Sequence, residues 1–481
     1  MNIAEPRKSV AAIILSDCEP AEILLVKRSP GLRFMPNHYV FPGGSIDKDD
    51  GGGRVLHAES DEHARSILAV AREIFEETGL LCCVEGVPSI DELYAYREKM
   101  DAGVARFSDV IERYGVTLDA DRFVPAGRWI TPMMAPIRFD TQYYIYFHQG
   151  PRYERLHEAE IVALDWLTAA EARRRWRDNK LKLSPPVAYA LKQLASFPYP
   201  NCIEHLRTAT ERVPGIPGQI ELRQGVRIFP LVTETIPPAT HTNCLVFGEE
   251  ELLIVDPGPT DVDELAWLQS QIDRILLTGA SVKAVLLSHA HPDHVGGAVA
   301  LRARYGAPIW AHEAAARRLD FGVDRHVQDG ETIVLRGDRD WELTCIHTPG
   351  HDSGHLCLLE TTTRTLFAGD MVANPGTIVV AHEFGGDMDQ YLKSLERLIA
   401  CDFSLLIPSH GIPPKNPKEK LRETIAHRLW RERRIKDAWD AGHTTMDALL
   451  SAAYDDAPKE SLGLAALSLK AHLHRLGLSA S

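Results

Sequence analysis

Cysteine is scarce in this sequence, and long apolar runs are missing from it. Eight cysteines occur among 481 residues, and none of them forms a C-x-x-C pair. This usage is typical of a reducing compartment rather than of a disulfide framework. No apolar stretch reaches the roughly 20 residues of a membrane-spanning helix, and the run at residues 10–15 is too short for a signal-peptide core. We therefore expect a cytoplasmic protein without membrane association.

The sequence also lacks an excess of positive charge. Lysine and arginine number 53 against 67 aspartates and glutamates, which gives a formal net charge of −14. This balance excludes binding of nucleic acid or membrane by the molecule as a whole, although local basic patches can still bind. The chain contains no internal repeat and no low-complexity tract. Its length suggests about three domains, and its 44% apolar content can bury normal cores.

One short segment is dense in metal-binding side chains. Residues 289–294 read His-Ala-His-Pro-Asp-His, an H-x-H-x-D-H motif. The apolar residues 282–287 before it predict a buried strand, and residues 295–297 after it predict a turn into a helix. Open α/β sheets place their chemistry at such strand ends. Three imidazoles and a carboxylate within six residues therefore predict a zinc site.

Later segments supply further candidate ligands. His351 follows a turn, and Asp370 and His410 are each expected to end a short apolar strand. With these residues, the segment from about Gly225 to Pro414 resembles the metallo-β-lactamase superfamily, in its glyoxalase II-like branch. The resemblance implies two zinc ions and an αββα sandwich. It assigns one ion to His289, His291 and His351, the other to Asp293, His294 and His410, and a bridging position to Asp370.

The chemistry of two zinc ions agrees with a hydrolase. Zinc lowers the pKa of bound water from roughly 15.7 towards about 7, so two ions can share a hydroxide at neutral pH and polarise the bond under attack. We predict Asp293 as a catalytic residue of this centre. The alternative is a set of structural histidines. For the flanking His347 and His355 a supporting or structural role is expected.

Two features narrow the branch. Position 370 holds aspartate where the zinc β-lactamases would hold cysteine, which argues against antibiotic hydrolysis. The spacing from Asp370 to His410 is too short for the inserted domain of the RNA-processing β-CASP nucleases. We therefore expect a thioester or a related ester as the substrate.

A second signature lies in the first third of the chain. Residues 72–80 match R-E-U-x-E-E-x-G-U, where U is aliphatic, and this half of the Nudix box carries the resemblance to Nudix hydrolases. The apolar pattern predicts a helix over residues 66–78, ended by Gly79. Like charges on one helix face repel, and a divalent cation between them resolves the conflict. The predicted ligands of magnesium or manganese are Glu73, Glu76 and Glu77, of which Glu76 and Glu77 are also predicted to be catalytic.

The match to the Nudix box is incomplete. Residues 41–44, Phe-Pro-Gly-Gly, resemble the lead-in to the box, but Ala58 and Ala64 stand where the box glycine and its first glutamate are expected. The stretch at residues 47–58 is expected to be an inserted loop. A helix with a solvated acidic face and a non-catalytic binding module are the alternatives.

A third signal concerns the substrate. Residues 24–29, Arg33 and residues 41–44 resemble the additional signature of the coenzyme A diphosphatase group of Nudix enzymes. By this resemblance Arg28 and Arg33 would pair with phosphates of the 3′-phospho-ADP moiety. Ordinary Nudix strand and loop sequence is the equal alternative. Glu160 is a further candidate metal ligand or base, and the predicted substrate-binding residues are Arg28, Arg33, Gly43 and Gly44.

The end of the chain is basic. Residues 415–436 hold many lysines and arginines, and residues 445–450 and 465–476 predict two short helices. The tail resembles the winged-helix domain that follows the metal domain in the β-lactamase-like protein 2 group. A basic winged helix is typical of nucleic-acid binding. The favoured alternative is a packing domain beside the metal cleft, since the tail lacks the aromatic ladder that binds single strands.

Together these patterns predict an α/β multidomain protein and a two-site metal-dependent hydrolase. We expect a Nudix α/β/α sandwich at residues 1–195, a Pro-rich linker at 196–222, a metallo-β-lactamase αββα sandwich at 223–415 and a small winged-helix-like domain at 416–481. The expected partners are small molecules, namely coenzyme A or nucleotide derivatives. The alternative function is an RNA-processing endoribonuclease whose Nudix half acts on nucleotide ends or only binds. The oligomeric state stays open.

Overall fold

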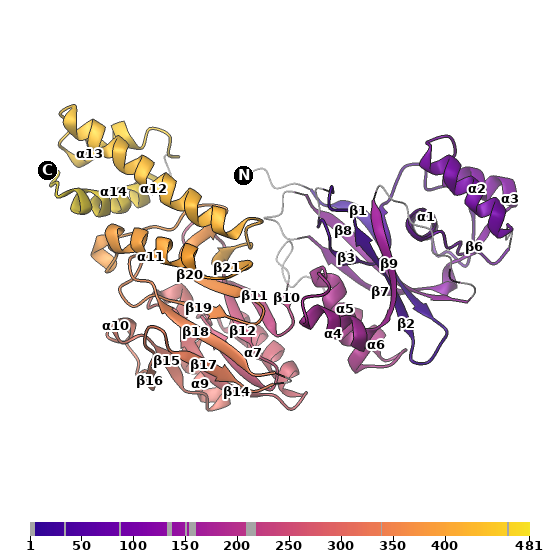
Figure 1. The fold of residues 1–481 in the computed structure, drawn as a ribbon, viewed down its shortest axis with the longest axis horizontal. Coiled ribbons are helices and arrows are strands. Elements are labelled where there is room, and N and C mark those ends of the chain that lie inside the picture. The colour runs from indigo at the N-terminus through magenta and orange to yellow at the C-terminus, as the bar shows by residue number, and fades with distance from the viewer. Residues whose placement is uncertain are drawn as a thin grey trace. The chain divides into compact units, whose positions relative to one another are not determined.

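The computed structural model describes residues 5–32, 35–85, 88–131, 137–149, 152, 160–207, 218–337, 339–458 and 461–481. The chain forms two compact units, Met1–Gln224 and Gly225–Ser481 (Figure 1). Among the helices of these described ranges, none is both long enough and apolar enough to cross a bilayer.

The first unit is built on one mixed sheet with helices on both faces (Figure 1). Its strands pair in the order β3-β2-β1-β8-β7, while β4 joins β1 and β9 joins β2. β1 and β8 run parallel, and the other pairs are antiparallel. The strands are β1 (Arg7–Ser16), β2 (Glu22–Arg28), β3 (Tyr39–Val40), β4 (Gly43–Ser45), β7 (Phe123–Ile130), β8 (Phe139–His148) and β9 (Ile161–Thr168).

Alternation along β1 divides its side chains between two helical layers. Val10, Ala12 and Ile14 pack with α1, whereas Ala11 and Ile13 pack with α4 and α5. The predicted α/β/α sandwich is therefore confirmed. The segment expected to be a linker includes α6, which packs with β7. The helices are α1 (Asp61–Thr78), α2 (Ile90–Asp101), α3 (Phe107–Tyr114), η1 (Ala120–Arg122), α4 (Ala169–Arg177), α5 (Pro185–Ser196) and α6 (Cys202–Arg207), and the remaining strands are β5 (Arg54–Leu56), β6 (Thr117–Asp119) and β10 (Ile220–Arg223).

The helix α1 is longer than the sequence pattern predicted. It begins at Asp61 instead of residue 66, because the side chain of Ser60 caps it by accepting a hydrogen bond from the backbone N–H of His63. Gly79 ends the helix in the left-handed conformation, at φ 78°, as predicted. The result is a rigid platform that holds all three glutamates.

The second unit is a sandwich of two sheets between helices (Figure 1). One sheet contains the order β11-β12-β13-β14-β15-β16, the other is β17-β18-β19-β20-β21, and β12 lies against β21. The first sheet packs with α7 and α9, and the second packs with α11 and α12. This confirms the αββα layering.

The bounds of its strands are β11 (Val226–Val232), β12 (His241–Phe247), β13 (Glu251–Val255), β14 (Ser281–Leu287), β15 (Ile309–Ala311), β16 (Arg325–His326), β17 (Thr332–Leu335), β18 (Trp341–His347), β19 (Leu356–Glu360), β20 (Thr365–Asn374) and β21 (Leu405–Gly411). The helices of the sandwich are α7 (Val262–Leu276), α8 (Pro292–Val295), α9 (Ala298–Tyr305), α10 (Glu313–Ala316), η2 (His382–Phe384) and α11 (Met388–Ala400). Because β14 ends at Leu287, the H-x-H-x-D-H motif follows a buried strand directly, as predicted.

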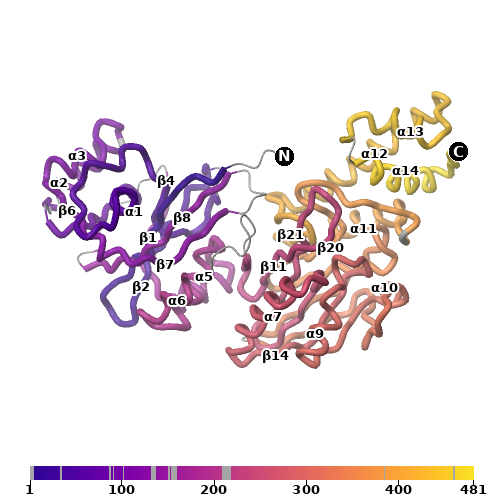
Figure 2. Tube along the Cα trace, turned by 180° about the vertical axis from the view of Figure 1, so that it is seen from behind, coloured from indigo at the N-terminus to yellow at the C-terminus, as the bar shows by residue number. Residues whose placement is uncertain are grey.

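The tail is helical and packs on the sandwich. α12 (Pro417–Asp440), α13 (Met446–Ala453) and α14 (Leu462–Leu476) form a cluster, in which α12 and α14 contact α11 (Figure 2). The two predicted short helices are confirmed. Residues 416–458 and 461–481 contain no strand, so the winged-helix assignment stays a prediction.

Candidate metal centres

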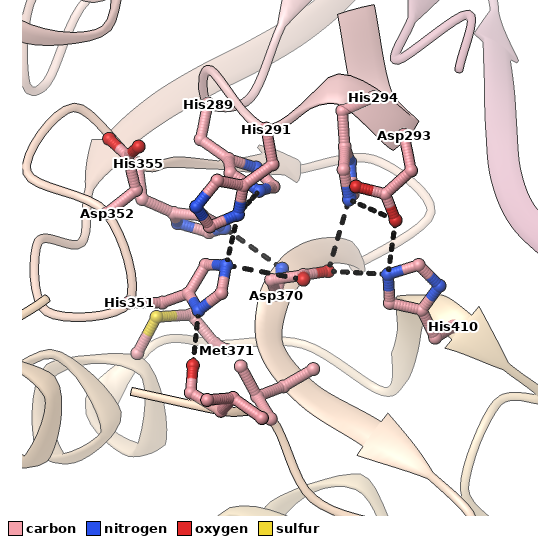
Figure 3. A network of polar contacts seen from close by, with 12 residues as sticks. His289, His291, Asp293, His294, His351, Asp352, His355, Asp370, Met371 and His410 are labelled. Atoms are coloured by element: carbon pink, nitrogen blue, oxygen red, sulfur yellow. Dashed lines mark hydrogen bonds and ion pairs between the residues drawn. The ribbon is translucent and has the colours of Figure 1, made fainter. Parts of the chain in front are cut away.

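The seven ligands predicted for the second unit lie together (Figure 3). The loop after β14 and the start of α8 hold the H-x-H-x-D-H motif, and the turn between β18 and β19 holds His351. β20 and β21 hold Asp370 and His410. Residues that are far apart in sequence therefore meet where strands of both sheets end.

Three imidazoles form the first cluster. The Nε2 atoms of His289 and His351 lie 3.0 and 2.9 Å from Nδ1 of His291. One nitrogen of each ring thus faces a common point, and the three ligand atoms lie within 4.8 Å of one another. Three imidazole nitrogens around one point are a donor set that zinc prefers.

A second cluster lies beside the first. The Nε2 atoms of His294 and His410 lie 3.7 and 3.5 Å from Oδ2 of Asp293. Asp370 stands between the clusters, with Oδ2 at 3.4 Å from Nε2 of His351 and Oδ1 at 3.4 Å from Nε2 of His410. One carboxylate therefore faces both clusters, which is the position predicted for a bridging ligand.

A bulge presents Asp370. The expectation that this residue ends its strand is wrong, because β20 continues to Asn374. The pairing of β20 with β21 shifts register on both sides of Gly369, which has φ 52°. A Cβ atom at Gly369 would come within 2.4 Å of Nε2 of His355. Glycine is therefore required both by the conformation and by the close approach, and the bulge turns Asp370 into the centre.

A buried carboxylate that the sequence analysis did not predict connects the clusters. Oδ2 of Asp256 accepts hydrogen bonds from Nδ1 of His294 at 2.9 Å and from Oγ of Ser288 at 2.6 Å. The same hydroxyl lies 2.9 Å from Nδ1 of His289. Asp256 thus orients one histidine of each cluster. A signal for it was present, since Asp256 directly follows the apolar strand β13.

Backbone carbonyls orient two further ligands. Nδ1 of His351 donates to the carbonyl of Val379 at 2.8 Å, and Nδ1 of His410 donates to the carbonyl of His241 at 3.1 Å. A ring that donates through Nδ1 keeps the lone pair of Nε2 for the centre. Both rings are therefore prepared to bind a cation.

The two flanking histidines lie outside both clusters. Nε2 of His347 donates to the carbonyl of Ser353 at 2.9 Å. Nδ1 of His355 lies 2.8 Å from Oγ1 of Thr348. Each ring thus uses one nitrogen in a contact outside the clusters, which agrees with the supporting role expected for both residues.

Burial governs the charges of the histidines. Burial, followed by the charge of His351, lowers the pKa of His291 to about 2, and burial lowers the pKa of His289 well below its usual value. Burial also lowers the pKa of His294, but three carboxylates outweigh it and raise that pKa to about 10, namely Asp293, Asp370 and Asp256. Burial thus favours the neutral forms of His289 and His291, whereas the carboxylates around His294 attract positive charge.

Two buried atoms test whether the centre fits metal ions. Nε2 of His294 and Oδ1 of Asp370 have no hydrogen-bond partner in the part of the chain that the structure describes. Buried polar atoms are rarely left without one. Both atoms point into the second cluster, where a divalent cation would satisfy them together. The donor set thus fits a pair of metal ions.

A second candidate centre lies on α1 in the first unit. Nη1 of Arg72 donates to Oε1 of Glu73 at 2.9 Å and to Oε2 of Glu76 at 3.0 Å. Arg72 is itself only 12% exposed. The guanidinium therefore holds two of the three predicted ligands side by side.

The two lead-in glycines lie against the other faces of these glutamates. The backbone N–H of Gly43 donates to Oε2 of Glu77 at 3.1 Å. A Cβ atom at Gly44 would come within 2.3 Å of Oε1 of Glu73. The missing side chain of Gly44 thus allows β4 to approach α1 closely, whereas that of Gly43 allows it to approach β1, where a Cβ atom would come within 2.3 Å of the carbonyl oxygen of Val10.

These carboxylates border a cavity of about 420 Å³. Burial raises the pKa of Glu73 to about 7 although the charge of Arg72 opposes it, and burial raises the pKa of Glu77 well above its usual value. A cation would offset the cost of burying these charges. Both acidic and apolar side chains line the cavity, among them Glu76, Glu160, Leu68, Met100, Phe107 and Ile111.

Of the remaining residues predicted for the first unit, some lie in the described part of the chain and one does not. Arg28 ends β2, and its charge lowers the pKa of Glu77 against the larger effect of burial. Arg33 lies outside the described residues. Ala58 packs against the core cluster that includes α1. Neither Ala58 nor Ala64 has a side-chain oxygen that could bind a metal ion.

Family comparisons match the two regions that hold these centres. The model of the metallo-beta-lactamase superfamily matches residues 237–410. The model of the NUDT19 Nudix domain matches residues 57–194. Both regions therefore correspond to hydrolase domains.

Individual relatives cover parts of the chain. A beta-lactamase-like protein 2 homolog from Caenorhabditis elegans is 31% identical over 41% of this chain and 64% of its own length. A hydroxyacylglutathione hydrolase from a Polaromonas species is 38% identical over 31% of this chain and 54% of its own length. The crystal structure of a NUDIX hydrolase from Alicyclobacillus acidocaldarius is 30% identical, with a TM-score of 0.36, over 41% of this chain and 94% of that one. The chain thus spans less than two thirds of both curated relatives.

Proposed function

We propose that both domains of this chain, a Nudix domain followed by a metallo-β-lactamase domain, are active metal-dependent hydrolases. The second domain would hydrolyse thioesters or related esters with two zinc ions. The first would split diphosphates with magnesium or manganese. The observation that carries the proposal is the position of Asp370, whose two oxygens face the two histidine clusters.

The donor set of the second domain supports zinc. The two clusters and Asp370 together offer five imidazoles and two carboxylates. Nitrogen-rich sites of this kind suit zinc better than magnesium or calcium. Two zinc ions would supply an activated water and positive charge against the acyl carbonyl. The chain itself aims the ring nitrogens, through Asp256 and backbone carbonyls. Asp293 keeps 14% of its side chain exposed, more than His410 or Asp370, which supports it as the catalytic carboxylate.

The helical tail supports a small-molecule substrate over RNA. Much of its basic run is neutralised from within, since Arg431 pairs with Asp456 and Arg434 pairs with Asp455. Arg428 is buried and donates to a backbone carbonyl. Arginines held in this way contribute little to phosphate binding, which needs accessible cations. The likeness to a hydroxyacylglutathione hydrolase favours a thioester instead.

The cavity of the first domain supports a diphosphatase. Oxygen ligands suit magnesium, which keeps several waters and binds substrate phosphates at the same time. The apolar side chains in the lining of this cavity suit a non-polar group next to the diphosphate. The charge of Arg28 lowers the pKa of Glu77, against the larger effect of burial. Arg28 and Arg33 are the proposed partners of a further phosphate. Coenzyme A meets these requirements, because a 3′-phosphate and a long, weakly polar arm flank its diphosphate.

An acyl-coenzyme A unites the two activities. It contains a thioester for the zinc domain and a diphosphate for the Nudix domain. The proposed location is the cytoplasm. All eight cysteines carry free thiols, and the cytosol keeps thiols reduced.

The experiment is product analysis with one acyl-coenzyme A and two single-site variants. The wild type should release free acid and also adenosine 3′,5′-bisphosphate. His291→Ala should abolish only the release of acid, and Glu76→Gln should reduce only the release of the bisphosphate, by orders of magnitude. If Glu76→Gln cleaves diphosphates as fast as the wild type, the first domain is a binding module. Cleavage of short RNA without any action on acyl-coenzyme A would support the endoribonuclease alternative.

A further inference from the structure

The loop at residues 47–53 contributes a buried carboxylate to the centre of the first domain. Asp50 is only 4% exposed although it belongs to an inserted surface loop. Its Oδ1 accepts from Nε of Arg72 at 2.7 Å, and its Oδ2 accepts from Nη2 of Arg72 at 3.0 Å. Two parallel hydrogen bonds of this kind fix the plane of a guanidinium as well as its position.

The loop is built to bury this side chain. Oδ2 of Asp50 also accepts from the backbone N–H of Asp47 at 2.7 Å, and the N–H of Asp50 donates to the carbonyl of Asp47 at 3.2 Å. Gly52 has φ 78°, a conformation that glycine adopts without strain. A Cβ atom at Gly53 would come within 2.6 Å of Leu68 on α1. The turn is thus pressed onto the helix that carries the glutamates.

The donors of Arg72 are divided between two sets of acceptors. Nε and Nη2 bind Asp50, and Nη2 also donates to the carbonyl of Ser45 at 2.9 Å. Only Nη1 contacts Glu73 and Glu76. The oxygens of these glutamates that do not contact Arg72 are therefore available to a cation.

We propose that Asp50 is a positioning residue for the metal ligands of the Nudix domain, acting through Arg72. This inference rests on the proposed diphosphatase function, and it explains how the site works although Ala64 replaces a glutamate of the box. With Asp50 present, Arg72 is held at the side of the glutamates. Without it, Nε loses its acceptor and Nη2 keeps only the carbonyl of Ser45 within hydrogen-bond distance. The guanidinium then turns onto Glu73 and Glu76, where it competes with the cation.

The test measures Mn²⁺ binding to the zinc-saturated full-length protein in the absence of substrate. Asp50→Asn should raise the dissociation constant of Mn²⁺ by roughly tenfold to a hundredfold, the usual effect of removing a residue that orients metal ligands. Asp50→Glu retains the charge and should recover most of the affinity. The control is Asp140→Asn, because Asp140 forms a pair of hydrogen bonds with Arg128, at 2.6 and 2.7 Å, on β7 and β8. It should leave Mn²⁺ binding within about twofold of the wild type.

A double-mutant cycle separates positioning from a general loss of structure. Lysine at position 72 cannot form the two parallel hydrogen bonds, so Asp50→Asn should have less than about twofold effect in an Arg72→Lys background. Full additivity, or wild-type Mn²⁺ affinity of Asp50→Asn, would overturn the proposal. If Asp50→Asn fails to fold, weak Mn²⁺ binding by folded Asp50→Glu, as weak as that of Glu76→Gln, would overturn it as well. Unchanged Mn²⁺ binding by Glu76→Gln would overturn the diphosphatase function together with it.

Discussion

His355 holds the backbone of Asp370. The N–H of Asp370 donates to Nε2 of His355 at 3.0 Å. Both residues are buried, and the contact lies at the bulge that turns the carboxylate into the centre. The position of the carboxylate between the two clusters therefore depends on a histidine that is not itself in either cluster.

His355→Ala should lower the metal content and the esterase rate of the second domain. The substitution leaves the buried N–H of Asp370 without an acceptor, and removal of a residue that orients a ligand typically weakens metal binding by roughly tenfold to a hundredfold. Elemental analysis after dialysis against a weak chelator measures the loss. The control is His347→Ala, since Nε2 of His347 donates to a backbone carbonyl and its ring stacks on His312, outside both clusters. Equal metal content in both variants would contradict the role of His355.

Asp256→Asn should weaken both metal positions together. One carboxylate contacts a histidine of the second cluster directly and a histidine of the first through Ser288. The other oxygen, Oδ1, accepts from the backbone N–H of Ser288 at 2.7 Å. An amide supplies only one oxygen, so it cannot keep this hydrogen bond together with those to Oδ2. Ser288→Ala is the matched variant, and it should affect the first cluster alone. Stepwise cobalt titration by absorption spectroscopy distinguishes the two positions, and loss of one position only in Asp256→Asn would contradict this prediction.

Gly44→Ala should impair the Nudix domain without affecting the zinc domain. The added Cβ atom would meet Oε1 of Glu73 at 2.3 Å, so the carboxylate must move away from its place beside Glu76. Diphosphate hydrolysis should fall by roughly tenfold or more, as expected when a metal ligand is displaced. Gly31→Ala is the control, because its Cβ atom would have only ordinary contacts. A Gly44→Ala protein with full diphosphatase activity would show that Glu73 is not needed in this position.

Arg431→Ala should destabilise the tail rather than weaken RNA binding. Arg431 is buried and binds Asp456 through two hydrogen bonds, at 2.7 and 2.9 Å. Hydrogen bonds to charged groups contribute about 1.5–3 kcal/mol each to the free energy of unfolding. Because the carboxylate of Asp456 is half-exposed, we expect a loss at the lower end of this range. Thermal unfolding measures the change. Two results together would support the nucleic-acid interpretation instead. The wild type would bind RNA with an affinity that falls steeply with salt, and a folded Arg431→Ala protein would not bind RNA.

Local patterns were sufficient to predict which side chains meet at both candidate centres. The residues of the H-x-H-x-D-H motif lie together because they follow the end of one strand. The three glutamates lie together because they share one face of α1. Asp256 has a similar signal, but a lone aspartate after a strand has no partner in its own segment. Asp50 could not be predicted at all, because its contact with Arg72 depends on a loop that folds back onto the helix. The bulge at Gly369 was also missed, since the apolar residues of β20 do not reveal where its pairing shifts.

The central claim is that the second domain holds two metal ions bridged by Asp370, and elemental analysis tests it most directly. Freshly purified, fully folded protein should contain about two transition-metal ions per chain, mainly zinc. Asp370→Ala should reduce this content at both positions. Folded wild-type protein that contains no transition metal, and gains neither metal nor activity when zinc is added, would contradict the account.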